Sequence, residues 1–167
     1  MDRSIEVQEQ GTAVAFSFQE MLRYSGPGSP GGVALGFKMM ERAFAVLEPD
    51  GPVQRREVVV QTAFGGPGAR DACELVTRGL TEGRYVVDAA LERPERGDTL
   101  RTFVFRVRYR DRTVSLLLRE GFVTDEFVRL ARSSDLSGEE QQRFTEMKRA
   151  LADHLMATNA VDVFDVE

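Results

Sequence analysis

The sequence predicts a mixed fold of α-helices and β-strands that forms one domain over residues 1–167, and three patterns predict it. Apolar residues recur at helical spacing near both ends of the chain. In the middle, a valine-rich strand, a glycine loop, a helix and a second strand predict a parallel crossover. A long alternation of residue types after position 102 predicts an antiparallel hairpin.

The first predicted elements are two amphipathic helices. Residues 1–11 are polar and are expected to be flexible. Helical spacing of apolar residues then predicts one helix over 12–24 and another over 30–47, joined by a loop rich in glycine and proline. The apolar residues that define the helices are Val14, Phe18, Met21 and Leu22 in the first and Val33, Phe37, Met40, Phe44 and Leu47 in the second.

The middle of the chain is predicted to form a strand, a helix and a second strand. Val58, Val59 and Val60 make a continuous apolar run, which is typical of an interior strand. The glycine-rich segment 65–71 follows and opens a helix. Residues 84–87 are then expected to return as a strand parallel to the first.

The clearest strand signal lies between residues 102 and 118. Aromatic and branched residues alternate with polar ones, and the sequence RDR at 110–112 predicts the turn of a hairpin. Arg106 and Arg108 share one face of the first strand. We expect that face to be solvated or to lie against acidic residues.

Two helices and an apolar tail complete the chain. Thr124 is a candidate N-cap for a short helix, and Ser137 with Glu140 has the pattern of a capping box before a longer one. The tail at 159–167 is too apolar to remain in water. It is therefore expected to dock on its own domain or on a second copy.

Composition argues against several classes of function. The net charge of −5 argues against nucleic-acid binding, because phosphate neutralisation needs a positive surface. No stretch is apolar enough to span a membrane and the N-terminus has no apolar leader, so a cytoplasmic protein is expected. The only cysteine, Cys73, is expected to be buried, and the only histidine, His154, to be structural or at the surface. No metal site and no cofactor are predicted.

Two glycine-rich loops, 24–32 and 65–71, are the main candidates for a binding site. Each precedes a predicted helix, and the free amides at a helix N-terminus attract anions. If the fold brings these helix ends together, Ser25, Ser29 and Arg70 could join the amides around a phosphate or carboxylate. The alternative is simple turn chemistry, with an acidic residue placed to favour the helix dipole. The candidate ligand-binding residues are Tyr24, Ser25, Gly26, Ser29, Gly31, Gly65, Gly68, Arg70 and Asp71.

Four segments follow one another in an order that a known family shares. Residues 24–38 read YSGPGSPGGVALGFK, and residues 69–88 read ARDACELVTRGLTEGRYVVD. The hairpin at 103–120 and the closing VFDVE complete the set. Together they resemble the N-terminal domain of the FmdE family of formylmethanofuran dehydrogenase proteins, whose first loop typically reads FHGHxCPGxALGYR.

The resemblance implies an α+β fold with a mixed four-stranded sheet, similar to the catalytic-domain fold of glyceraldehyde-3-phosphate dehydrogenase, and often a homodimer. It does not carry over a metal site. Ser25, Pro27 and Ser29 stand where family members have two histidines and a cysteine, and Gly68 and Gly79 stand where they have further cysteines. Ser, Pro and Gly side chains supply no thiolate, imidazole or carboxylate ligand.

Three functions remain as hypotheses. The first is a non-catalytic ligand-binding or accessory domain that binds a small anion at its glycine loops. The second is an enzyme for a small one-carbon or carboxylate metabolite, with Asp71, Glu74 or Glu20 as acid or base. Tyr24 or Ser25 would assist it. The third is a structural homodimer or a subunit of a larger assembly, held through the apolar tail.

Overall fold

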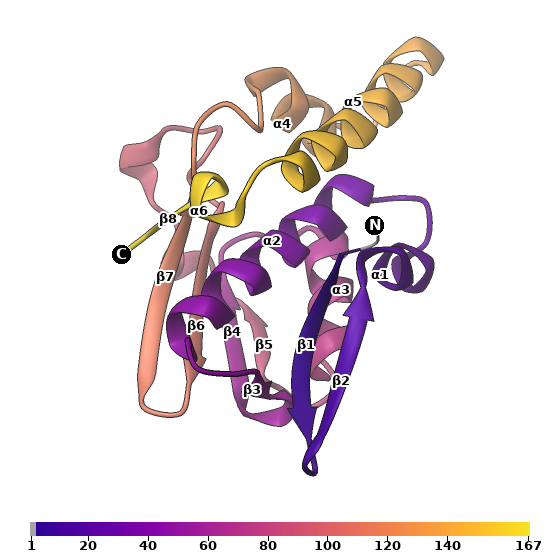
Figure 1. Ribbon diagram of the computed structural model, residues 1–167. Helices are drawn as coiled ribbons and strands as arrows, with labels where there is room; N and C mark the ends of the chain where they lie inside the picture. The colour runs from indigo at the N-terminus through magenta and orange to yellow at the C-terminus, as the bar shows by residue number, and fades with distance from the viewer. Residues whose placement is uncertain (1–2) are drawn as a thin grey trace.

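The computed structural model describes residues 3–167, which form α-helices packed with β-sheets, as the sequence predicts (Figure 1). The strands are β1 (Ser4–Glu9), β2 (Thr12–Ser17), β3 (Val53–Gln54), β4 (Val58–Thr62), β5 (Tyr85–Val87), β6 (Val104–Tyr109), β7 (Arg112–Leu118) and β8 (Phe164–Val166). The helices are α1 (Phe18–Ser25), α2 (Pro30–Leu47), α3 (Pro67–Thr77), α4 (Asp125–Arg132), α5 (Gly138–Ala157) and α6 (Ala160–Val163).

Two sheets organise these strands. The larger sheet has the order β5-β4-β6-β7-β8 and is mixed, because β4 and β5 run parallel while the other neighbours run antiparallel. Strands β4 to β7 are the four that the sequence predicts, and β8 adds a fifth. The smaller sheet has the order β2-β1-β3. Figure 1 shows α2 crossing the centre of the molecule between the β1–β2 hairpin and the β6–β7 hairpin.

The N-terminal segment is a β-hairpin, so the predicted flexibility of 1–11 is wrong for Ser4–Glu9. Residues 1–2 of that prediction lie outside the part of the chain that the structure describes. Ile5 and Val7 alternate with exposed residues and are buried in the core, which is the period of a half-buried strand.

The helix predicted over 12–24 is also partly wrong, because its first half is strand β2. Gln10 and Gly11 have φ values of 51° and 78°, and two consecutive residues with positive φ make the turn that suits a two-residue hairpin. Helix α1 starts only after Ser17, whose hydroxyl accepts the amide hydrogen of Glu20 in a capping box.

The long helix α2 is the centre of the core, and its predicted apolar stripe is buried. It packs against both α3 and α5. The contact with α3 is close because small residues meet there: a Cβ added at Gly36 would lie 3.0 Å from the Cα of Ala69 and 3.0 Å from the Cβ of Ala72. The two helix backbones therefore approach each other with almost no side-chain volume between them.

The crossover and the hairpin in the middle of the chain are confirmed. The chain leaves β4, passes through α3 and returns as β5 in parallel, with Val60 opposite Tyr85. Strands β6 and β7 form the predicted antiparallel hairpin, and its turn is shorter than predicted, since Arg112 already belongs to β7 and lies opposite Tyr109. Arg106 and Arg108 are exposed, so their face of the hairpin is solvated.

The C-terminal caps are confirmed as well. The hydroxyl of Thr124 accepts from the amide of Phe127, and Ser137 with Glu140 forms the expected capping box of α5. The apolar tail docks on its own domain, where β8 pairs with β7 and Phe164 is fully buried. An ion pair between Arg119 and Asp165, 2.8 Å apart, holds the outer side of this strand.

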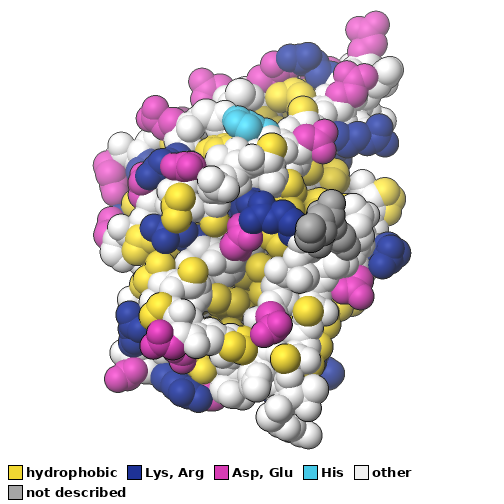
Figure 2. All heavy atoms as spheres, viewed as in Figure 1, with side chains coloured by type: hydrophobic (Ala, Val, Ile, Leu, Met, Phe, Trp, Pro, Cys, Tyr) yellow, Lys and Arg dark blue, Asp and Glu magenta, His cyan; other side chains and the backbone are white. Residues whose placement is uncertain are grey.

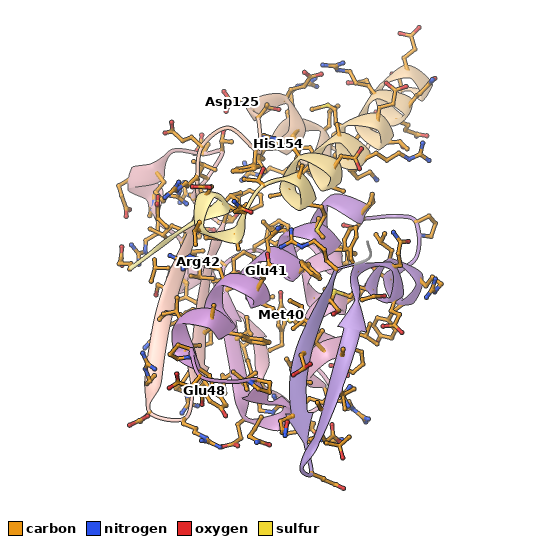
Figure 3. All side chains as sticks on the ribbon, viewed as in Figure 1. Met40, Glu41, Arg42, Glu48, Asp125 and His154 are labelled. Atoms are coloured by element: carbon orange, nitrogen blue, oxygen red, sulfur yellow. The ribbon has the colours of Figure 1, made fainter. Side chains whose placement is uncertain are left out.

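Charged side chains are spread widely over the face seen in Figure 2, and hydrophobic side chains occupy the hollow at its centre. His154 is exposed on α5 (Figure 3), and the centroid of its ring lies 4.5 Å from the ring centroid of Phe122. Within residues 3–167 no helix is long and apolar enough to cross a bilayer.

Candidate functional site

A cavity of about 610 Å³ lies where the N-terminal ends of α2 and α3 meet the helices α4 and α5. Figure 1 shows α4 and α5 forming the layer above the N-terminal end of α2. The volume falls in the range of small-molecule sites, which is about 300–1,000 Å³. Its lining residues are Ser25, Gly28, Ser29, Gly31, Gly32, Leu35, Phe64, Gly65, Gly66, Pro67, Asp71, Thr102, Phe103, Phe127, Val128, Ala131, Arg132, Phe144, Lys148 and Leu151.

Two pairs of phenylalanines provide the apolar walls of this cavity. Phe64 and Phe103 are stacked, with ring centroids 4.7 Å apart and an interplanar angle of 27°. Phe127 of α4 and Phe144 of α5 meet edge to face at 5.3 Å. Leu35 of α2 and Leu151 of α5 add further apolar surface to the lining. Such a lining favours a flat apolar group.

Helix ends supply the polar part of the wall. Gly31 and Gly32 lie in the first turn of α2, where backbone amides have no partner within the helix. The N-cap of α2, Ser29, makes no side-chain capping hydrogen bond. The α3 end contributes Gly66 and Pro67, its N-cap and first residue. Both helix dipoles thus present their positive ends at this cavity.

Two cationic side chains reach the cavity from the α4–α5 side. The ammonium group of Lys148 donates to the carbonyl oxygen of Gly28 at 2.8 Å and lies 4.6 Å from the centroid of the Phe144 ring. Arg132, at the end of α4, has no ion-pair partner among the described residues. It also lines a second cavity of about 950 Å³, which the segment 96–100 lines as well.

One carboxylate lines the cavity, and other side chains already engage it. The Ser25 hydroxyl donates to Asp71 at 2.9 Å, and the Arg70 guanidinium donates to it at 3.1 Å. The Ser25 contact joins the end of α1 to the first turns of α3. The binding hypothesis drawn from the sequence required the fold to bring the two glycine loops together, and the contact between Ser25 and Asp71 joins them.

The structure brings five of the nine candidate residues to the cavity wall, namely Ser25, Ser29, Gly31, Gly65 and Asp71. The other four do not line it. Tyr24 is 53% exposed, and Gly26 ends α1 with a φ of 86°. Gly68 is buried between α3 and α2, and Arg70 is exposed and turned to Asp71.

The other acid–base candidates have local structural partners. Glu20 accepts from the amide of Ser17 at 2.7 Å in the α1 capping box, and it does not line the cavity. Glu74 accepts from the amide of Thr81 at 2.9 Å. Burial by itself raises the pKa of Glu74, but the hydrogen bonds from Thr81 and Leu80 and the charge of Arg78 together outweigh it and hold that pKa below its usual value. Burial strongly raises the pKa of Cys73, so its reactive thiolate is suppressed.

Sequence patterns did not point to several of the residues that line the cavity. Phe64 and Phe103 belong to loops beside β4 and β6, while Phe127 and Phe144 lie on two helices that the sequence treats as separate apolar stripes. Lys148 is one of only two lysines in an arginine-rich chain, which is a weak signal by itself. No local pattern indicates that these residues face one cavity.

Comparison with known proteins does not assign the chain to a family. No protein-family model matches the sequence, and no curated protein matches it. The resemblance to the FmdE family of formylmethanofuran dehydrogenase proteins stays a prediction. In the described part of the chain, no group of three or more His, Cys, Asp or Glu side chains is placed to hold a metal ion.

Proposed function

We propose that this protein is a non-catalytic binding domain for a small molecule that combines a flat apolar body with one anionic group. The observation that carries the proposal is the cavity of about 610 Å³, which is lined by two pairs of phenylalanines and by polar groups from the helix ends. The apolar body would lie between the Phe64–Phe103 pair and the Phe127–Phe144 pair. Burial against such walls is the main source of affinity in small-molecule sites.

The cations and free amides of the cavity favour a ligand with a negative charge. Gly31 and Gly32 supply free amides at the positive end of α2, and Lys148 and Arg132 add positive charge. The carboxylate of Asp71 is offset by the Arg70 guanidinium and the Ser25 hydroxyl. A phosphate or carboxylate on the ligand therefore meets a net favourable field.

A catalytic role has weaker support. Asp71 is the only one of the three acid–base candidates that lines the cavity, and it already accepts from two neighbouring side chains. General acid–base catalysis needs such a group free to exchange a proton with the substrate. Binding without chemistry is the function that these contacts support best.

Filling the cavity tests the proposal. We expect Ala131→Phe, which adds a ring at the α4 wall, to weaken binding of the anionic dye 1-anilinonaphthalene-8-sulfonate by at least about tenfold, because the ring occupies space that the dye needs and keeps it from the apolar walls. Fluorescence titration measures the dissociation constant. Ala150→Phe is the matched control, because Ala150 is an exposed residue of α5 outside the lining. Equal dye binding by both variants would count against this cavity as the site.

A second variant tests the charge of the ligand. Lys148→Met keeps the length and apolar stem of the side chain and removes the ammonium group. We expect it to weaken the sulfonate dye by about fivefold to tenfold, while the neutral analogue N-phenyl-1-naphthylamine changes by less than about twofold. The same titration measures both dyes. A parallel loss for both would show that Lys148 acts only by packing on Phe144.

A further inference from the structure

The outer edge of the small sheet carries backbone groups without partners. In a hairpin with a two-residue turn, the residues that flank the turn form a hydrogen-bonded pair, and such pairs alternate along the ladder. Glu9 and Thr12 flank the turn, so Val14 and Phe16 also bond to β1. The amide and carbonyl groups of Ala13 and Ala15 therefore point away from β1. No other described residue hydrogen bonds to them.

This edge also lacks the features that usually protect a strand. β2 is six residues long and reads TAVAFS, without a charge, a proline or a bulge. The other edge strands among the described residues are shorter, with three residues in β5, three in β8 and two in β3. Ala13 and Ala15 are exposed, and their small side chains leave the edge open to another strand.

From this edge we infer that β2 pairs antiparallel with β2 of a second copy of this chain, about a twofold axis at Val14. In that register Ala13 faces Ala15 of the other copy, and both residues present outward amide and carbonyl groups. Such a pair exchanges two hydrogen bonds, and the twofold axis repeats it. All the outward groups of Ala13 and Ala15 in both copies are then satisfied, and the two small sheets join into one of six strands.

The neighbouring side chains fit the same register. Val14 faces its own copy in a non-hydrogen-bonded pair, where side chains lie closest, and Phe16 faces Thr12. Residues that lie opposite one another on neighbouring strands form rows across the joined sheet. Val7 of each copy lies beside Val14 in the central row, and Glu6 lies in the same row as Gln8 of the second copy. No two like charges meet across the junction. The strand is thus complementary to itself, which argues for a second copy over an unrelated partner strand.

Disulfide cross-linking tests the register. Val14→Cys should oxidise to a covalent dimer on a non-reducing gel, because non-hydrogen-bonded partners have Cα atoms roughly 4.5 Å apart. Ala13→Cys is the matched control, since the two copies of residue 13 are diagonal neighbours roughly 8 Å apart, too far to bridge. The native Cys73 is fully buried and stays out of the reaction. Cross-linking of Val14→Cys no greater than that of Ala13→Cys would overturn the inference.

Light scattering tests the pairing itself. The native chain should have the mass of a dimer, and Ala15→Pro should raise the dimer dissociation constant by about 30-fold, because it removes one outward donor from each copy. Proline suits this position, as no β1–β2 hydrogen bond uses the amide of residue 15. Ala15→Thr keeps the amide and should keep the dimer. A native chain that is monomeric at every concentration tested, or a dimer equally stable in both variants, would contradict the inference.

Discussion

Replacing Gly68 by alanine is expected to destabilise the protein by about 3 kcal/mol or more, because the added methyl group has no space. A Cβ at this position would lie 2.6 Å from the carbonyl oxygen of Ser29, 2.6 Å from the amide nitrogen of Val33 and 2.7 Å from the carbonyl carbon of Gly32. All three atoms are backbone, so relief requires α2 and α3 to move apart. Urea denaturation followed by circular dichroism measures the loss.

Gly65→Ala is the control for this prediction. Gly65 lies in the same loop, its φ is not in the left-handed region, and a Cβ there would meet nothing within 4 Å. We expect its free energy of unfolding to stay within about 0.5 kcal/mol of the native value. Similar losses in the two variants would show that the α2–α3 contact is not the cause. The prediction also gives Gly68 a role in packing, which keeps the two helix ends together at the cavity.

Removing the carboxylate of Glu41 is expected to cost about 3 kcal/mol, because it leaves a buried lysine without its partner. The side chain of Lys38 is fully buried in α2, and its ammonium nitrogen lies 3.0 Å from a carboxylate oxygen of Glu41. The other carboxylate oxygen lies 2.5 Å from the guanidinium of Arg3. The carboxylate of Glu41, which is half-buried on α2 (Figure 3), therefore contacts both cations. Chemical denaturation of Glu41→Ala measures the effect.

Lys38→Met is the matched control, since it removes the buried charge and keeps a side chain of similar length. Replacing a buried ion by a well-packed apolar residue is often neutral, so we expect a change within about 1 kcal/mol. A loss as large as that of Glu41→Ala would mean that the pair itself, and not the unpaired lysine, decides the energy.

The pH dependence of Glu41→Ala gives a second readout. Burial lowers the pKa of Lys38, while the hydrogen bond and the charge of Glu41 raise it. Loss of Glu41 therefore lowers this pKa further. Between the lowered folded pKa and the unfolded value near 10.5, the unfolded chain binds more protons, so stability rises with pH. We therefore expect the difference in free energy of unfolding between Glu41→Ala and the native protein to become smaller as the pH rises from neutral to about 10.

The elements that sequence patterns predicted best are those whose signals are local. The capping residues Thr124 and Ser137 mark helix starts by satisfying nearby amides, and both are observed as caps. The alternation of residue types in 102–118 is also a local signal. It predicts strands because every second residue of a strand must enter the core.

The N-terminal hairpin was missed because two periods compete in one segment. Val14 and Phe18 are four residues apart, which fits a helix, while Val14 and Phe16 are two apart, which fits a strand. Pairing with Ile5 and Val7 decides for the strand. That pairing joins residues across the Gln10–Gly11 turn, and glutamine with a positive φ is not a common turn signal.

Turn chemistry and local periodicity in the sequence are enough to predict the central crossover, the β6–β7 hairpin and the position of the two glycine loops. Only the tertiary structure decided that Ser25 meets Asp71, that four phenylalanines from distant segments line one cavity, and that β2 lies at an open edge. These features depend on how α2, α3 and α5 pack. Packing of this kind is set by contacts between residues far apart in the chain, which no local pattern encodes.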